Sequence, residues 1–168
     1  MSYVRELRAL VGHRPLIIAG AAVLIFDRDN RLLLHHREDN RQWGLVGGSL
    51  EVGETFEETA RREAMEESGL TLDELIWFDL FSGQEMIYQY PHGDVIVNVT
   101  AVYTSRKFNG KLKPDEIDGN DYIFTCKAAI CASALFKDSY HSLAGSLSAT
   151  IPAPTCPYTL ARSESVFT

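Results

Sequence analysis

The longest apolar run of the chain, Leu16–Phe26, constrains the fold more than any other feature. It holds 11 residues without a charge, which is too few to cross a membrane but enough for a long β-strand. Turn-forming residues 27–30 follow, and then the segment Arg31–Arg37 with three consecutive leucines. We therefore expect a β-hairpin whose two strands are buried on both faces.

Further segments alternate between strand-like and helical patterns. Tyr3, Leu7 and Leu10 recur at helical spacing before Gly12, which predicts a helix over residues 2–11. Short strands or apolar pieces are expected in five segments, with a turn at residues 108–110: Trp43–Val46, Leu75–Phe81, Met86–Tyr90, Val95–Tyr103 and Asp121–Thr125. Together with one long central helix, this order predicts an α/β fold in which helices cover a mixed β-sheet.

The length of 168 residues predicts a single domain over residues 1–125, with its core in residues 15–125. The C-terminal segment 126–168 differs in composition, because Asp138 and Glu164 are its only acidic residues. Cys126–Phe136 suits a terminal helix, whereas the proline-rich residues that follow suit an irregular tail. Two readings stay open: the tail is poorly ordered, or it pairs with another subunit in a homodimer.

The formal net charge of −7 opposes binding to a nucleic acid polymer. Small phosphorylated ligands are still allowed, because a bound divalent cation inverts the local charge. The sequence has no signal-peptide pattern and no membrane span, so we expect a cytoplasmic location with reduced cysteines. A zinc site formed by Cys126, Cys131, Cys156 and His141 is an alternative, although its spacing matches no usual ligand pattern.

A glutamate-rich segment, residues 48–70, carries seven glutamates and two arginines. Within it, Thr55 and Glu58 have the spacing of a capping box, and Gly69 is placed to end a helix. This predicts a helix over Thr55–Ser68. Helical pairing of Glu57 with Arg61, and of Glu58 with Arg62, would account for two of the glutamates.

Three glutamates are left without such partners: Glu63, Glu66 and Glu67. On a helix they fall within an arc of about 100°, and like charges at that spacing repel by roughly 0.2–0.5 kcal/mol per pair. Ala64 beside them leaves open space. Carboxylates clustered in this way suit hard cations, which take oxygen ligands, and the alternative is a solvated helix face.

The spacing of these residues resembles a known signature. It reads Gly48-x5-Glu54-x7-Arg62-Glu63-Ala64-x-Glu66-Glu67-x-Gly69-Leu70. This resembles the Nudix box, with Ala64 where the family has a bulkier aliphatic residue, and the resemblance covers residues 15–125. It implies the Nudix fold, an α/β/α sandwich, and hydrolysis of a nucleoside diphosphate linked to another moiety X with Mg²⁺ or Mn²⁺.

The resemblance also implies a role for each box residue. Glu63, Glu66 and Glu67 would be metal ligands, with the Gly47 carbonyl as a further ligand. Arg62 would orient the glutamates and Glu54 would brace the box. Three candidates for the general base stay open, namely Glu66, Glu67 and Glu116 in the acidic pair that follows Pro114.

Contacts with the substrate are predicted from four polar or aromatic side chains: Arg37, Gln84, Tyr88 and Tyr90. Adjacent His35 and His36 point to opposite faces of a strand, so they cannot both line one pocket. We expect neither to be catalytic. The sequence fixes neither the base of the nucleotide nor X. Two other functions are kept as alternatives, a nucleotide-sensing module without turnover and an isomerase on the same scaffold.

Overall fold

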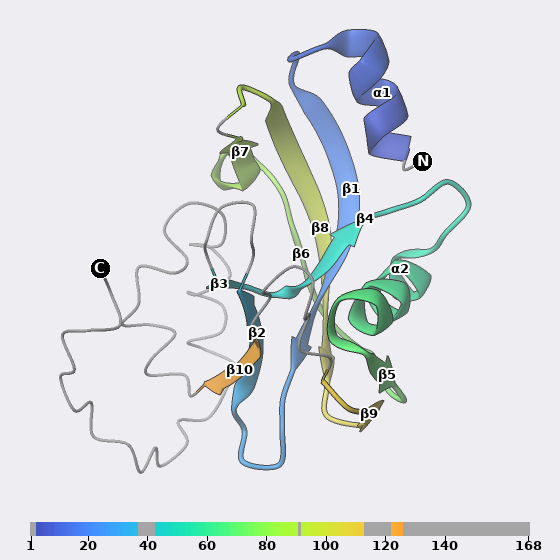
Figure 1. Ribbon diagram of the computed structural model, residues 1–168, viewed down its shortest axis with the longest axis vertical. Coiled ribbons are helices and arrows are strands. Elements are labelled where there is room, and N and C mark those ends of the chain that lie inside the picture. The colour runs from blue at the N-terminus through green and yellow to red at the C-terminus, as the bar shows by residue number, and fades with distance from the viewer. Residues whose placement is uncertain (1–2, 37–42, 91, 113–121, 126–168) are drawn as a thin grey trace, which may run out of the picture.

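The computed structural model describes residues 3–36, 43–90, 92–112 and 122–125. Its centre is a five-stranded mixed sheet with the order β4-β1-β8-β6, to which β7 adds by pairing with β8 (Figure 1). The strands are β1 (Leu16–Ile25), β4 (Val46–Ser49), β6 (Ile76–Phe81), β7 (Ile87–Gln89) and β8 (Val95–Ser105). β1 and β8 run parallel along the whole of β1, and the other pairs are antiparallel. The mixed α/β sheet predicted from the sequence is confirmed.

The hairpin predicted for residues 16–37 is wrong. β2 (Leu32–His36) leaves the central sheet and pairs with β10 (Tyr122–Thr125) and β3 (Trp43–Gly44) in a second sheet. Its only bridge to the end of β1 joins Phe26 to Leu32, among the residues that the structure describes. β8 pairs with one edge of β1 along its whole length and β4 pairs with the other edge at residues 20–23, so β2 meets β1 only at its end.

A third, two-stranded sheet joins β5 (Leu70–Leu72) to β9 (Phe108–Gly110). Residues 108–110 were expected to form a turn, so that expectation is wrong. The backbones approach closely here: a Cβ on Gly110 would lie 2.5 Å from the carbonyl oxygen of Gly69, and Gly110 has φ of +111°. Gly110, which suggested a turn in the sequence, is therefore needed because the two strands approach each other closely.

Two apolar clusters lie on the two faces of β1, which is buried on both sides as predicted. Ala21 and Val23 belong to the cluster that packs against the second helix, while Ala22 and Leu24 belong to the cluster facing the second sheet. The alternation follows from the period of two residues in a strand. Apolar packing thus holds the glutamate-rich helix on one face of the central sheet.

Two α-helices are described. α1 (Tyr3–Val11) lies at the start of β1, and α2 (Phe56–Glu63) packs on β1 and β4 (Figure 1). α2 continues without a break into a π-helical turn, η1 (Ala64–Ser68), and a 3₁₀ turn, η2 (Gln84–Met86), precedes β7. Within the described ranges no helix is long and apolar enough to span a membrane. The predicted terminal helix Cys126–Phe136 lies outside the described residues.

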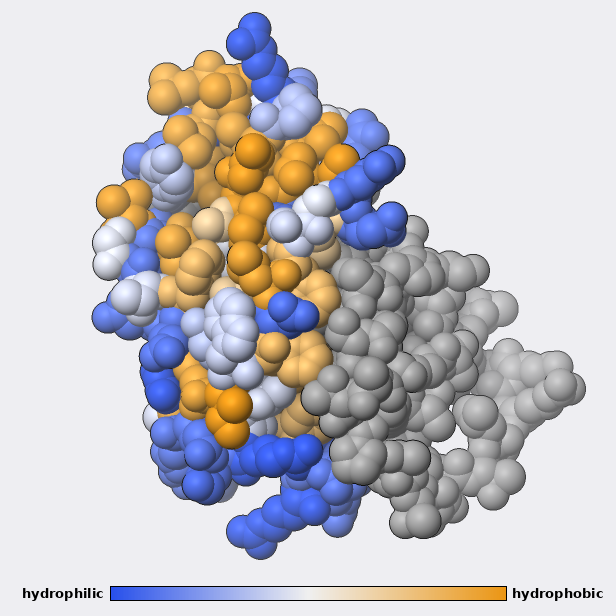
Figure 2. All heavy atoms as spheres, turned by 180° about the vertical axis from the view of Figure 1, so that it is seen from behind, coloured by the Kyte–Doolittle hydropathy of each residue, from blue (hydrophilic) through white to orange (hydrophobic). Residues whose placement is uncertain are grey.

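α2 covers only part of its face of the sheet. On β6, Ile76, Trp77 and Leu80 are about half exposed, as is Ile87 on β7. The register places Leu80 beside Ala101, a member of the cluster under α2, so this part of the α2 face is open to solvent. Seen from behind, the molecule likewise presents apolar surface (Figure 2).

Candidate active site

Helix α2 begins at a capping box. The Thr55 hydroxyl accepts a hydrogen bond from the Glu58 N–H at 3.2 Å, and Glu58 Oε2 accepts one from the Thr55 N–H at 2.8 Å. These two bonds satisfy donors that a helix start would otherwise leave unpaired. The Thr55 N–H and the Thr55 hydroxyl both donate to Glu58 Oε2 and so lower the pKa of the Glu58 carboxyl. The capping box predicted from the sequence is confirmed, and it accounts for Glu58.

The helix ends in a wide π-type turn. Gly69 adopts φ of +75° and donates its N–H to the Met65 carbonyl at 3.0 Å, as expected for a helix-ending glycine. Inside the turn, the Ser68 hydroxyl donates to the Ala64 carbonyl at 2.6 Å. Such turns widen the helix by one residue and occur often at functional sites. Here the turn carries Glu66 and Glu67.

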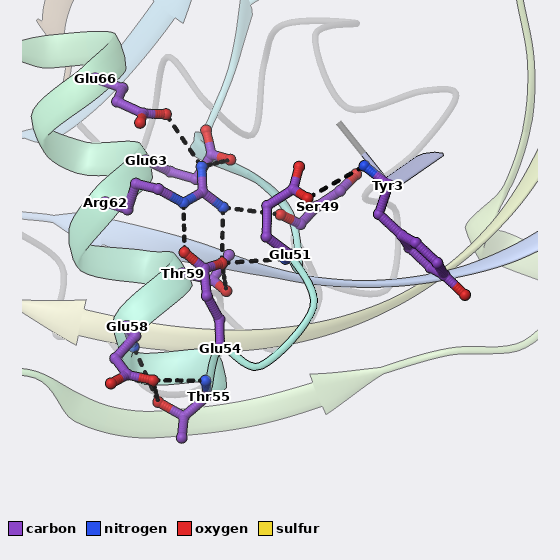
Figure 3. Close-up of polar contacts among 10 residues, drawn as sticks. All are labelled: Tyr3, Ser49, Glu51, Glu54, Thr55, Glu58, Thr59, Arg62, Glu63 and Glu66. Carbon is purple, nitrogen blue, oxygen red and sulfur yellow. Dashed lines mark hydrogen bonds and ion pairs between the residues drawn. The ribbon is translucent and has the colours of Figure 1, made fainter. Parts of the chain in front are cut away.

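Arg62 is the hub of the site (Figure 3). Its Nε donates to Glu54 Oε1 at 2.7 Å and its Nη2 to Glu54 Oε2 at 3.0 Å, a bidentate pair. Nη2 also donates to the carbonyl of Ser49 at 3.0 Å, which ties the helix to β4. The partner of Arg62 predicted from the sequence was Glu58, but Arg62 binds Glu54 instead. From this position, Arg62 can bind the Glu54 carboxylate and β4 at the same time.

The other nitrogen of the guanidinium, Nη1, faces two further carboxylates. It donates to Glu63 Oε1 at 2.6 Å and to Glu66 Oε2 at 3.1 Å. The Glu63 side chain is 14% exposed and that of Glu66 is 59% exposed. The contact with Glu66 joins residues four positions apart, which are neighbours on the surface of a helix.

Hydrogen bonds, charge and burial around Arg62 shift the pKa values of Glu54, Glu63 and Arg62 itself. The hydrogen bond from Arg62 lowers the pKa of Glu54 to about 2, helped by the Glu51 N–H and the Thr59 hydroxyl. The same hydrogen bond raises the pKa of Arg62. For Glu63, burial of the carboxyl raises the pKa, and Arg62 only partly opposes this. Glu63 is thus an ionisable group in a site that penalises its charge.

Gly48 leaves the space that Glu63 fills. A Cβ at position 48 would lie 2.3 Å from Glu63 Oε1 and 2.5 Å from its Cδ. On the opposite side of β4, a Cβ on Gly20 of β1 would lie 2.5 Å from the Gly48 carbonyl oxygen. The glycine that begins the box is therefore needed for close approach to the carboxylate.

Glu67 lies apart from Arg62, against β4 and the second sheet. Its Oε2 accepts the N–H of Gly47 at 2.9 Å, and its Oε1 lies 3.7 Å from Nδ1 of His35. Its main-chain carbonyl accepts a hydrogen bond from the Tyr122 hydroxyl. In an antiparallel pair, successive residues alternate between facing the partner strand and facing away from it. The Leu50 N–H bonds to β1, so Gly47, three residues earlier, faces away from β1. The carbonyl and the N–H of Gly47 therefore both point away from β1.

The donor set suits a hard cation, but its side chains are not gathered around one point. Within the part of the chain that the structure describes, no three His, Cys, Asp or Glu side chains converge closely enough to hold a metal ion. The carboxylates of Glu63 and Glu66 both bind Arg62, which stands between them. The Glu67 carboxylate binds Gly47 instead, so the three carboxylates stay apart. Three carboxylates and an outward carbonyl are the oxygen ligands that Mg²⁺ takes, and the exposed Glu66 has room to turn.

Tyr88, one of the four residues predicted to contact substrate, lies far from this cluster. Tyr88 is level with Leu16 of β1, whereas Gly47 is level with Ala22, a separation of about 20 Å along the strands. Tyr88 packs edge-on against Tyr90, with ring centroids 4.8 Å apart. Gln84 is exposed in η2. Arg37 and Glu116 lie outside the described residues.

Sequence reasoning missed two residues that lie against Glu67. His35 is buried on β2, and Tyr122 stacks on it from β10 with ring centroids 4.9 Å apart and planes 14° apart. The one local indication that His35 is buried was the run Leu32–Leu34, which predicts a strand buried on both faces. Nothing near Tyr122 in the sequence indicates its contact with a residue 55 positions away.

Two curated proteins share part of this sequence. The NudC NAD-capped RNA hydrolase of Enterobacter sp. (strain 638) is 32% identical over 90 residues, 48% of this chain and 35% of that protein. A putative 8-oxo-dGTP diphosphatase of Bacillus subtilis (strain 168) is 42% identical over 50 residues, 30% of this chain and 34% of that protein. The chain thus spans about a third of the length of these curated relatives.

Solved structures support the fold. A MutT protein from Bacillus halodurans has a TM-score of 0.59 at 20% identity, covering 76% of this chain and 78% of that one. A MutT NUDIX hydrolase from Burkholderia pseudomallei has a TM-score of 0.55 at 23% identity, covering 81% and 99%. The model of the NUDIX domain family matches residues 17–140, well over half of the sequence. The chain therefore belongs to the Nudix family, which its glutamate motif resembles.

Proposed function

We propose that this chain is a metal-dependent pyrophosphohydrolase that cleaves a nucleoside diphosphate linked to another moiety X. The observation that carries the proposal is that Glu63, Glu66 and Glu67 all lie at the end of α2 and in η1, with Glu63 against Gly48 and Glu67 on the Gly47 N–H. A helix face that served only solubility would not bury the Glu63 carboxyl or build a glycine gap for it.

The ion we propose is Mg²⁺ or Mn²⁺, held by Glu63, Glu66, Glu67 and the Gly47 carbonyl. When bound, it would neutralise the phosphate oxygens and lower the pKa of a bound water. Arg62 holds Glu63 and Glu66 on its Nη1 while its other nitrogens bind Glu54, so Glu54 fixes the arginine when a glutamate turns away. Glu66 and Glu67 remain the general-base candidates within the described site.

The substrate class is a small nucleotide derivative rather than a nucleic acid polymer. The net charge of −7 opposes binding to a long phosphate backbone. The relatives' names mention NAD-capped RNA and 8-oxo-dGTP, and both contain a pyrophosphate bond. We therefore place the dinucleotide NAD and oxidised nucleoside triphosphates among the candidates. A cytoplasmic location, a homodimer and substrate contacts from Arg37, Gln84, Tyr88 and Tyr90 remain predictions.

A substrate screen tests this function. ADP-ribose, NAD, dinucleoside polyphosphates, nucleoside sugars and 8-oxo-dGTP would be incubated with the protein at mildly alkaline pH, with Mg²⁺, with Mn²⁺ and with a chelator. We expect metal-dependent release of a nucleotide and a phosphorylated X from at least one compound. Tight nucleotide binding with no turnover across the panel would favour a sensing module instead, and conversion without P–O–P cleavage would favour an isomerase.

A further inference from the structure

Glu67 is held at three points by three separate strands. β4 supplies the Gly47 N–H to Oε2, β2 places His35 beside Oε1, and β10 supplies the Tyr122 hydroxyl to the main-chain carbonyl. Glu63 and Glu66, the other two glutamates proposed as metal ligands, have different surroundings, because both are held by Arg62. Glu67 is thus positioned by strands of both the central and the second sheet rather than by Arg62.

The Tyr122 contact acts on the backbone. The last carbonyls of a helix have no partner within the helix, and Tyr122 binds that of Glu67 inside the π-type turn. Because this hydrogen bond holds the backbone of the turn in place, it also sets the direction in which the Glu67 side chain leaves the backbone. Tyr122 is in turn held by its stacking on His35 and by packing against the apolar cluster under α2.

The His35 contact acts on the carboxylate. The side chain of His35 is 8% exposed and that of Glu67 is 22% exposed, so little water screens the pair. The distance of 3.7 Å from Nδ1 to Oε1 exceeds that of a hydrogen bond, so His35 limits the space on this side of the carboxylate. With Gly47 on the other oxygen, the carboxylate is confined between β2 and β4.

We infer that His35 and Tyr122 are positioning residues that hold Glu67 in the orientation needed to bind the metal, an inference that rests on the proposed function. Groups that orient a metal ligand typically change metal affinity by about 10–100-fold when they are replaced. The alternative is that the two rings only fill space at the junction of the sheets.

Four variants separate these readings. Tyr122→Phe removes the hydroxyl and keeps the ring, and His35→Gln removes the imidazole. Tyr103→Phe is the matched control for the first, because Tyr103 belongs to the same apolar cluster but packs against Trp77. His36→Gln is the control for the second, because His36 is adjacent on β2 and packs against Trp43.

Two readouts are needed. The first is the exchange rate of the Gly47 amide in metal-free protein, measured by ¹⁵N NMR. The second is the Mn²⁺ dissociation constant without substrate, measured by electron paramagnetic resonance. For Tyr122→Phe and His35→Gln we expect Gly47 exchange about tenfold faster, since its charged acceptor is no longer held. We expect Mn²⁺ binding to weaken by about 10–100-fold, with both controls unchanged.

Unchanged Gly47 exchange and unchanged Mn²⁺ affinity in both variants would overturn the inference and leave a packing role. A lower melting temperature with both readouts unchanged would have the same meaning. The result is separate from the fate of the proposed function, because neither readout requires turnover. A protein that cleaves nothing in the substrate screen could still show the expected change at Gly47.

Discussion

Replacement of Gly48 by alanine is expected to damage the site without unfolding the protein. The added Cβ would lie 2.3 Å from Glu63 Oε1, whereas ordinary van der Waals contact begins near 3.4 Å, so the carboxylate must retreat by about 1 Å. The obstructing atoms are the far end of a flexible side chain, and Gly48 has no positive φ. The loss of stability should therefore be about 1 kcal/mol or less, which is the range of a partly exposed ion pair.

The loss of activity should be larger, because a misplacement of about 1 Å at a reacting centre costs up to about 100-fold in rate. The assay is kcat/KM at saturating Mg²⁺ on the substrate identified in the screen, with unfolding by urea measured in parallel. Gly20→Ala is the contrasting variant: its Cβ meets the Gly48 carbonyl oxygen at 2.5 Å, so β1 and β4 must separate. It should lose about 1–3 kcal/mol of stability. Full activity in Gly48→Ala would refute the reasoning.

Two further predictions concern ion pairs, one in the site and one at helix α1. Glu54→Gln should lower the free energy of unfolding at pH 7 by about 1–2 kcal/mol, a value reduced from the full pKa shift because the pair is partly solvated. The pKa of Glu54 is lowered to about 2 from an ordinary 4.5, so its stabilisation is complete above pH 4.5 and is lost as the pH falls towards 2. Urea titrations should show this loss in the wild type, and an equal pH slope in Glu54→Gln would contradict it. Asp94→Asn should loosen α1, because Asp94 binds Arg8 at 3.2 Å and His13 at 2.6 Å. Hydrogen exchange should be several-fold faster in residues 3–11, and unchanged protection there would count against this anchor.

Local sequence signals predicted the glutamate-rich helix closely. Thr55 and Glu58 form the capping box and Gly69 ends the helix, because these features depend on residues at most a few positions apart. The π-type turn at Ala64–Ser68 was not predicted. Its extra residue per turn leaves no periodic signal in a segment so short.

Long-range pairing was the limit of the sequence reasoning. The apolar strands at residues 16–25 and 32–36 were located correctly, yet they do not pair with each other, because β4, β8 and β10 provide their partners. The same limit hid the contacts of Glu67 with His35 and Tyr122, which join three elements far apart in the sequence. Residue types and spacing indicated the box itself because all of its members lie within 23 residues.

The metal dependence of Glu67→Gln tests the central claim most directly. The measurement is the Mg²⁺ concentration for half-maximal hydrolysis, together with kcat, in the wild type, in Glu67→Gln and in Glu57→Gln. Glu57 is the control because it is an exposed glutamate in the first turn of the same helix. We predict that kcat falls by at least about 100-fold in Glu67→Gln and is unchanged in Glu57→Gln. Equal rates and equal Mg²⁺ requirements in all three proteins would contradict it.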